Sequence, residues 1–254
     1  MASAKDIVVK VINSRTARAI VKKIHYSGKC TQNSQLHFGV FIGEKLCGCL
    51  QFGPPIDRRR MLPLVAGSTW GNMLELNRMA FGPELPKFSE SRAISVCMKI
   101  IKKNYPQVKW IVSFADGCQC GDGTIYRASG FCLTAINKNS TMYKTPGGEV
   151  VADKTFNNSP VREYKGIKTK DCEKLEGFQL RYIYFIDKTY IEKLTVPILP
   201  FSDIDKAGAG MYKGKRISIK DRRVTKATSG DQSESGGAIP TNTLQQNEGA
   251  EDAS

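Results

Sequence analysis

The spacing of apolar residues predicts alternating strands and helices in the first half of the chain. Residues 6–12 alternate and are rich in Val and Ile, which indicates a strand, and the apolar period over 14–24 indicates a helix capped by Ser14. Apolar runs at 36–42 and 45–52, joined around Gly43-Glu44, predict a β-hairpin. Residues 72–79 form the next expected strand, with Leu74, Leu76 and Arg78 on one face.

The second half continues the pattern. A helix opens at Ser89 and ends before Pro106, and the apolar run 109–115 is typical of a strand covered on both faces. A glycine-rich loop and a short helix follow, and further strands are expected from residue 131 and over 179–187. Residues 145–177 are polar and receive no assignment. These elements predict an α+β fold with a central mixed sheet flanked by helices, in the order of a GNAT-type acyltransferase.

The pattern lapses after about Pro200. We therefore expect one domain over residues 1–200 and a tail over 201–254. The tail is strongly basic at 211–226, whereas 231–254 has acidic residues and neither Lys nor Arg. The last twenty-odd residues are rich in Ser, Gly, Gln, Asn and Glu, a composition typical of disorder. We expect the basic part to order on a partner.

Composition narrows the class of protein. A hydrophobic fraction of 41% is typical of a globular chain, and no apolar run reaches the ~20 residues that span a bilayer. The N-terminus lacks a secretory pattern, so we expect a cytoplasmic protein with no membrane association. The formal net charge of +14 favours a polyanionic partner, most commonly nucleic acid, although a basic surface also serves solubility alone. The cluster Arg58–Arg60 lies in a predicted loop and is either a phosphate contact or a solvated surface run.

The eight cysteines carry no exporting signal that would justify a disulfide framework, so we expect most to be reduced and buried. Two Cys-x-Cys pairs, 47/49 and 118/120, lack the spacing of a zinc knuckle. Plain packing is the favoured interpretation of both pairs.

Candidate chemistry gathers where the strand 109–115 ends. If this strand is parallel to 72–79, Asp116 and Arg78 emerge side by side, either as a salt bridge or as a base and an anion-binding cation. Tyr126, on the short helix, can point back toward Asp116, although packing explains it equally well. His25 and Tyr26 stand at a helix exit. Together His25, Tyr26, Asp116 and Tyr126 offer one imidazole and several oxygen donors, which suit oxidised iron better than soft metals, yet no spacing proves a metal. His37, in an alternating strand, has an expected structural role.

Several separate blocks of sequence carry a resemblance to a known family. They are His-Tyr-Ser-Gly (25–28), Phe-Gly-Val (38–40), Leu-Gln-Phe-Gly-Pro (50–54), Leu-Glu-Leu-Asn-Arg-Met-Ala-Phe (74–81), Ser-Glu-Ser-Arg (89–92), Ser-Phe-Ala-Asp-Gly (113–117) and Gly-Asp-Gly-Thr-Ile-Tyr-Arg-Ala-Ser-Gly-Phe (121–131). These blocks resemble, in order, the Mom family of phage DNA-modification proteins, and the resemblance covers residues 20–143 and 178–187. The resemblance implies a divergent GNAT-like enzyme that converts adenine in double-stranded phage DNA to N6-methylcarbamoyl (acetamido) adenine and shields the genome from host restriction.

The resemblance also implies a site and two cofactors, acetyl-CoA and iron. Carried over by motif, the catalytic residues are His25, Tyr26, Arg78, Asp116 and Tyr126, and all of these except Arg78 are implied metal ligands. The product joins nitrogen to the former methyl carbon of the acetyl group, which ordinary acyl transfer does not explain and which favours a redox metal. Because adenine N6 takes part in base pairing, the base is expected to flip out of the duplex.

Coenzyme binding follows a different pattern from the usual GNAT loop. The chain between 79 and 89 lacks the motif Gln/Arg-x-x-Gly-x-Gly/Ala, so the pyrophosphate is expected at the N-terminus of the following helix, at Ser89, Ser91 and Arg92. Two alternatives stay open: a conventional GNAT N-acetyltransferase acting on a small amine or a protein, and a DNA-binding protein without enzymatic activity.

Overall fold

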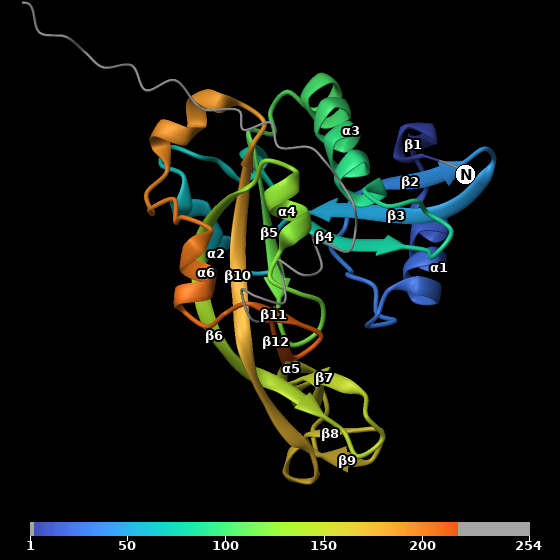
Figure 1. Cartoon of the computed structure of the whole chain (residues 1–254), viewed down its shortest axis with the longest axis vertical. Coiled ribbons are helices and arrows are strands. Elements are labelled where there is room, and N and C mark those ends of the chain that lie inside the picture. Colours follow the sequence, from blue (N-terminus) through green and yellow to red (C-terminus); the bar gives the residue numbers. More distant parts are fainter. Residues whose placement is uncertain (1–2, 218–254) are drawn as a thin grey trace, which may run out of the picture. The chain divides into compact units, whose positions relative to one another are not determined.

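The computed structural model describes residues 3–217 and is built on one eight-stranded mixed sheet, in the order β1-β2-β3-β4-β5-β10-β6-β7 (Figure 1). Within this sheet β4 and β5 run parallel, and every other neighbouring pair is antiparallel. The first five strands are β1 (Ile7–Val11), β2 (Leu36–Ile42), β3 (Lys45–Gly53), β4 (Met73–Phe81) and β5 (Trp110–Asp116). The predicted mixed sheet flanked by helices is confirmed.

The two long helices cover opposite faces of the sheet (Figure 1). Helix α1 (Ser14–Ile24), which Asn13 rather than Ser14 caps, packs against Cys49, whereas α3 (Ser89–Asn104) belongs to the same apolar cluster as Leu50. Cys49 and Leu50 are successive residues of β3 and therefore point to opposite faces. This double coverage explains why β3 is buried at consecutive positions.

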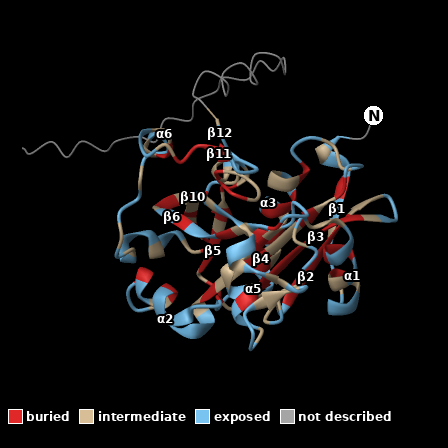
Figure 2. Ribbon diagram, turned by 90° about the horizontal axis from the view of Figure 1, so that it is seen from below, coloured by how far each residue is buried: buried red, intermediate tan, exposed pale blue. Residues whose placement is uncertain are grey.

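The remaining helical segments are short and lie mostly at the ends of strands. The α-helices are α2 (Arg58–Met61), α4 (Thr124–Ala128), α5 (Asp153–Asn157) and α6 (Ser202–Lys206), and the 3-10 turns are η1 (Ala4–Asp6), η2 (Leu62–Leu64), η3 (Trp70–Asn72), η4 (Thr169–Asp171) and η5 (Lys188–Lys193). The buried residues concentrate along the central strands beneath these segments (Figure 2).

The stretch 145–177, which the sequence pattern left unassigned, extends one end of the sheet. Strands β6 (Cys132–Lys144) and β10 (Glu173–Phe185) form a long antiparallel pair, and between them lie β7 (Val150–Ala152), α5, β8 (Glu163–Tyr164) and β9 (Ile167–Lys168) (Figure 1). The last strand of the sheet thus begins six residues before the predicted start at 179, because its polar first half pairs with β6. Lys29 Nζ lies 4.6 Å from the centre of the Tyr164 ring, which brings this extension to the loop after α1.

Part of the expected tail has regular structure. Residues 201–217 form α6, β11 (Met211–Tyr212) and β12 (Lys215–Arg216), and Ile204 and Met211 are buried. The Gly214 N–H donates to the Gly117 carbonyl at 2.9 Å, which fixes this segment against the loop after β5. Such short elements carry too few apolar positions to produce a periodic pattern. Residues 218–254 lie outside the described part of the chain, so their disorder stays a prediction.

Three further features bear on the sequence-based expectations. Within residues 3–217, no helix is both long and apolar enough to cross a membrane. His37 is 6% exposed and hydrogen-bonds through Nδ1 to the Gln51 amide at 3.1 Å, in keeping with its expected structural role. All eight cysteines are free, and Cys47, Cys49, Cys97 and Cys118 are buried.

Candidate active site

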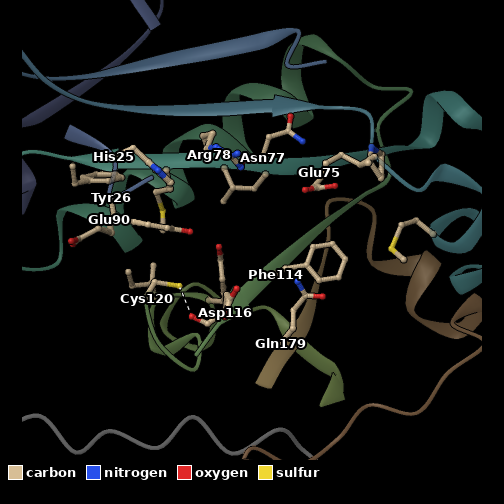
Figure 3. Close-up of a pocket in the computed structure, with 18 of the residues that line it drawn as sticks. His25, Tyr26, Glu75, Asn77, Arg78, Glu90, Phe114, Asp116, Cys120 and Gln179 are labelled. Carbon is tan, nitrogen blue, oxygen red and sulfur yellow. Dashed lines mark hydrogen bonds between the residues drawn. The ribbon is translucent and has the colours of Figure 1, made fainter. Parts of the chain in front are cut away.

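A pocket opens where the two parallel strands of the sheet separate. Strands β4 and β5 pair only from Met73–Trp110 to Glu75–Val112, and beyond this point each strand pairs with its other neighbour alone. The gap becomes a pocket of about 500 Å³, a volume typical of ligand sites. Its polar and aromatic lining comes from segments far apart in sequence (Figure 3): His25, Tyr26, Glu75, Asn77, Arg78, Glu90, Phe114, Asp116, Cys120, Tyr126 and Gln179.

The five predicted catalytic residues, His25, Tyr26, Arg78, Asp116 and Tyr126, all line this pocket. They come from the loop after α1, from β4, from the end of β5 and from α4. The pairing of β4 with β5 is parallel, as the prediction for Arg78 and Asp116 required. The fold thus brings together in one cavity residues that the sequence separates by up to a hundred positions.

His25 ends helix α1 and has a fixed ring. The backbone N–H of His25 donates to the Val21 carbonyl. The ring nitrogen Nδ1 lies 3.1 Å from the Ser27 backbone nitrogen and 2.8 Å from Ser27 Oγ. Because a backbone N–H can only donate, Nδ1 accepts, and the neutral ring carries its proton on Nε2. Burial, aided by the Arg78 charge, lowers the pKa of His25 to about 4, so the ring is neutral at pH 7. The neighbouring Tyr26 is 60% exposed and forms the rim of the pocket.

Asp116 ends β5 and organises the loop that follows. Its Oδ1 accepts a hydrogen bond from the Cys118 N–H at 2.9 Å, and Oδ2 lies 3.4 Å from the Asn139 amide. Its main-chain carbonyl accepts from the Cys120 N–H at 2.9 Å and lies 3.2 Å from Cys120 Sγ. Burial raises the pKa of the Asp116 carboxyl, and hydrogen bonds from Cys118, Gln119 and Asn139 oppose the rise. The result is a carboxylate of increased basicity facing the pocket.

Tyr126 lies on α4 and is buried. Its ring packs against Phe131 and Tyr182 at centroid distances of 5.3 Å and 5.2 Å, and its hydroxyl hydrogen-bonds to the Ser113 side chain. Gly123 precedes α4 with φ of +86°, and a Cβ there would lie 2.4 Å from the Tyr182 ring, so only glycine fits. Burial raises the pKa of the Tyr126 phenol, which is therefore protonated at neutral pH.

Arg78 does not form the salt bridge with Asp116 that was one of the two expected roles. Among the ion pairs of residues 3–217 there is none between these two side chains. Instead Arg78 Nε donates to the Lys29 carbonyl at 3.1 Å, and a terminal nitrogen donates to the Asn77 carbonyl at 2.7 Å. Arg78 thus anchors the loop that carries His25 and Tyr26.

The predicted coenzyme residues lie apart from this pocket. Ser89 is fully buried and donates to the Pro86 carbonyl at 2.7 Å, so its hydroxyl already has a structural role at the start of α3. Ser91 and Arg92 line a second, more open hollow of about 550 Å³, which Lys5 and Ser129 also line. Glu90, between them, faces the first pocket instead. The N-terminus of α3 therefore borders both cavities.

Sequence reasoning missed Glu75 and Asn77. The register between β3 and β4 slips by one residue here, so Asn77 has no partner on β3 and forms a β-bulge. A bulge redirects side chains, which interrupts the alternation expected for Leu74, Leu76 and Arg78. Asn77 is only 6% exposed, and its Nδ2 makes no hydrogen bond of standard geometry within the described residues, although its amide lies near the Glu75 carboxylate and opposes the rise in the pKa of that group. The sequence did contain a signal for this part of the pocket, because Glu75 and Asn77 are polar residues within an otherwise largely apolar strand.

The donors in the pocket do not form a conventional metal cluster. In the part of the chain that the structure describes, no three His, Cys, Asp or Glu side chains gather closely enough to hold a metal ion. A three-ligand site at His25 and Asp116 would therefore need a phenol oxygen from Tyr26 or Tyr126. These imidazole, carboxylate and phenol donors match iron in kind.

Comparison with known proteins places the chain in a family. Residues 6–203 match the model of the Mom protein family. A protein described as methylcarbamoylase Mom, from Escherichia phage Mu, is 35% identical over 200 residues, which is 77% of this chain and 82% of the phage protein.

Solved structures resemble the chain more loosely. A Bacillus subtilis acetyltransferase in complex with CoA is 11% identical with a TM-score of 0.40, covering 70% of this chain and 98% of its own. FeeM, an N-acyl amino acid synthase from uncultured soil microbes, is 14% identical with a TM-score of 0.42, covering 74% and 95%. At such TM-scores no functional argument follows from either structure.

Proposed function

The chain belongs to the Mom protein family, and from this premise we propose that it is a transferase that converts adenine in DNA to N6-methylcarbamoyl (acetamido) adenine. The similar protein of Escherichia phage Mu is described as a methylcarbamoylase. The observation that carries the proposal is the meeting of His25, Tyr26, Arg78, Asp116 and Tyr126 in one pocket. On this account the modification protects phage DNA from restriction and takes place in the cytoplasm of the host cell.

Double-stranded DNA is the proposed substrate, and the rim of the pocket supports it. Asp57 and Met61 flank the exposed run Arg58–Arg60 and both line the pocket. Arg58 lies 6.0 Å from the ring centre of Trp70, which is 52% exposed. Cations beside an exposed aromatic ring suit phosphates and an unstacked base. Because N6 is paired in the duplex, the adenine would enter the pocket flipped out of the stack.

Acetyl-CoA is the proposed donor. The second hollow carries Lys5 and Arg92 at its wall, and these cations together with the first-turn N–H groups of α3 would attract the coenzyme phosphates. Ser91 contributes a hydroxyl there, whereas Ser89 would act only through the backbone because its side chain is buried. The acetyl end would reach the first pocket past Glu90, which shares the same helical turn.

Within the pocket each residue has a proposed task. The Asp116 carboxylate, with its raised pKa, would accept the proton that leaves adenine N6. The neutral His25 ring and the Tyr126 phenol would donate hydrogen bonds to the acetyl group, and Tyr26 would shield the mouth from water. Arg78 would hold the His25 loop in place through Lys29.

Iron is the proposed metal, with His25, Tyr26, Asp116 and Tyr126 as the residues that would hold it. Bound iron would supply the redox chemistry that a bond to the former methyl carbon requires. Coordination through Nε2 would require the ring proton to move to Nδ1, where Ser27 Oγ at 2.8 Å can accept it and only the hydrogen bond from the Ser27 N–H is lost. Binding of ferrous or ferric iron to the purified protein, measured by calorimetry, tests this and should weaken in His25→Ala.

Nucleoside mass spectrometry tests the proposed function. DNA from iron-replete cells that express the protein should contain deoxyadenosine heavier by one methylcarbamoyl group. An acetyl adduct on a small amine or protein, with unmodified DNA, would instead identify a conventional N-acetyltransferase. DNA binding with no modified nucleoside would identify a binding protein without enzymatic activity.

A further inference from the structure

One end of the pocket contains two polar side chains that the proposed chemistry does not use. Glu75 and Asn77 lie on β4, and Figure 3 places Glu75 at the end of the pocket away from His25 and Tyr26. The Ile56 N–H donates to the Glu75 carboxylate, while burial raises its pKa. Asn77 is 6% exposed, and its amide lies near enough to the Glu75 carboxylate to oppose the rise in the pKa of that group; its Nδ2 makes no other hydrogen bond in the described chain, which leaves an amide proton for a ligand.

The orientation of the Asn77 amide is determined by its surroundings. Its Oδ1 accepts a hydrogen bond from Ser34 Oγ at 3.1 Å. Gly53, opposite Glu75 on β3, leaves the necessary room, because a Cβ there would lie 2.8 Å from Asn77 Oδ1 and 2.3 Å from the Asn33 carbonyl. With Oδ1 engaged, the amide presents its nitrogen on the side of Glu75 (Figure 3). The bulge at Asn77 supplies the redirected backbone that this arrangement needs.

A carboxylate beside an amide N–H is an acceptor next to a donor. Adenine offers the complementary order, because its N6–H group donates while N1 and N7 accept. Guanine and thymine present a carbonyl oxygen where adenine has N6–H, and a carboxylate would repel it. Cytosine, with its N4–H donor beside the N3 acceptor, repeats the order of adenine, but it has a single ring where adenine has two.

The opposite wall of this end suits a flat ring. Phe114 and Gln179 lie across the pocket from Glu75 and Asn77 in Figure 3, and Ile56 and Met61 also line the pocket. An aromatic side chain and apolar neighbours provide a stacking surface for any base. Such a surface binds bases without distinguishing them, so discrimination is left to the polar pair.

We propose that Glu75 and Asn77 are the base-reading pair of this enzyme: Glu75 accepts a hydrogen bond from adenine N6, and Asn77 Nδ2 donates to an adjacent ring nitrogen. This inference rests on the proposed function and names the residues that select its substrate. The pair holds the base at one end of the pocket and leaves the other end, near His25 and Tyr26, for the acetyl donor.

Binding of single-stranded oligonucleotides tests the pair directly. Labelled oligothymidylates with one central dA, dG or abasic residue avoid the cost of base flipping, and fluorescence anisotropy gives their affinities. Wild type should bind the dA probe roughly five- to a hundredfold more tightly than the dG probe. Glu75→Gln, which keeps the shape but removes the charge, should bring this ratio close to one, and Asn77→Asp should weaken dA binding. Glu192→Gln and Asn104→Asp, outside the pocket, are the matched controls and should keep the wild-type ratio.

Two results would overturn the inference: equal affinity of wild type for dA and dG, or an unchanged ratio in Glu75→Gln. Because Asn77→Asp affects a buried residue, its melting transition is measured in parallel, and the near-isosteric Glu75→Gln carries the test if Asn77→Asp unfolds. Nucleoside analysis separates the two proposals. Modified DNA from wild type together with an unchanged ratio rejects the base-reading pair alone, whereas unmodified DNA rejects the proposed function.

Discussion

The Arg78 guanidinium donates from Nε to the Lys29 carbonyl at 3.1 Å, and this bond ties β4 to the loop that follows α1. Lys29 in turn places its ammonium 4.6 Å from the Tyr164 ring, in the extension between β6 and β10. The loop of His25 and Tyr26 is therefore held from the sheet on one side and contacted by the extension on the other. Arg78 has a positioning role that its sequence motif does not reveal.

Replacing Arg78 should release this loop and change the charge near His25. In Arg78→Gln the bond to Lys29 is lost or weakened, and the positive charge that helps to lower the pKa of His25 disappears. We expect the pKa of His25 to rise above about 4, which an NMR titration of the imidazole measures. Arg92→Gln, on the exposed side of α3, is the control. An unchanged His25 pKa in Arg78→Gln would mean that burial alone sets it.

His25 should make the protein less stable in mild acid. The folded pKa is about 4 and the ordinary value is 6.5, so between these values the unfolded state binds more protons than the folded state. Stability from this group is therefore complete above pH 6.5 and falls as the pH decreases toward 4, by at most about 3 kcal/mol. Burial raises the pKa of Asp116 and Glu75, which contribute with the opposite sign.

A comparison of variants isolates the His25 contribution. His25→Asn keeps an acceptor for the Ser27 N–H but does not titrate, so its stability should fall less steeply over this pH window. Urea unfolding at a series of pH values measures the difference. Parallel curves for wild type and His25→Asn would contradict the assigned pKa.

The hydroxyl of Tyr126 should matter more for activity than for folding. Tyr126→Phe keeps the ring against Phe131 and Tyr182 and loses only the hydrogen bond to Ser113, a change of about 1 kcal/mol. If the phenol takes part in the chemistry, modification of DNA should fall roughly a hundredfold. Tyr105→Phe, outside the pocket, should have neither effect. Full activity in Tyr126→Phe would reduce Tyr126 to a packing residue.

The contribution of the basic segment 211–226 to DNA binding should be measured with a deletion that leaves its folded first part intact. Met211 is buried and Gly214 hydrogen-bonds to Gly117 beside Asp116, so a deletion that starts at 211 should disturb the site itself. A deletion of residues 219–254, all outside the described structure, should leave the melting transition in place and flatten the salt dependence of DNA binding. An unchanged salt slope would assign DNA contact elsewhere, with Arg58–Arg60 as the nearest candidate.

The sequence predicted most strands of the sheet, its two long helices and five of the residues that line the pocket, because each of these predictions depends on a local pattern or motif. The apolar runs of β3 and β5 identify strands covered on both sides, and the helix period identifies α1 and α3. The pairing of β4 with β5 and its early end depend on contacts between segments distant in sequence. The volume of the pocket depends on this separation of β4 from β5, and the hydrogen bond from Arg78 to the Lys29 carbonyl joins residues that are distant in sequence. No local sequence pattern predicts either feature.

Two polar residues show where such prediction stops. Asn77 reaches the pocket through a bulge, and a bulge is a register shift between strands that the sequence of one strand does not encode. Ser89 was expected to bind the coenzyme because it begins a helix, yet its side chain is turned into the protein at the start of α3. The position of a residue at a helix N-terminus does not determine the direction of its side chain.

The most direct test of the account compares Asp116→Asn with Asp203→Asn in cells that express each protein at the wild-type level and have ample iron. Asp116 faces the pocket, whereas Asp203 pairs with Lys206 on α6, away from it. Mass spectrometry of nucleosides from total DNA should show methylcarbamoyl deoxyadenosine with wild type and Asp203→Asn and its loss with Asp116→Asn. Equal modification by both variants would contradict the pocket as the site of chemistry, and unmodified DNA from all three would contradict the proposed function.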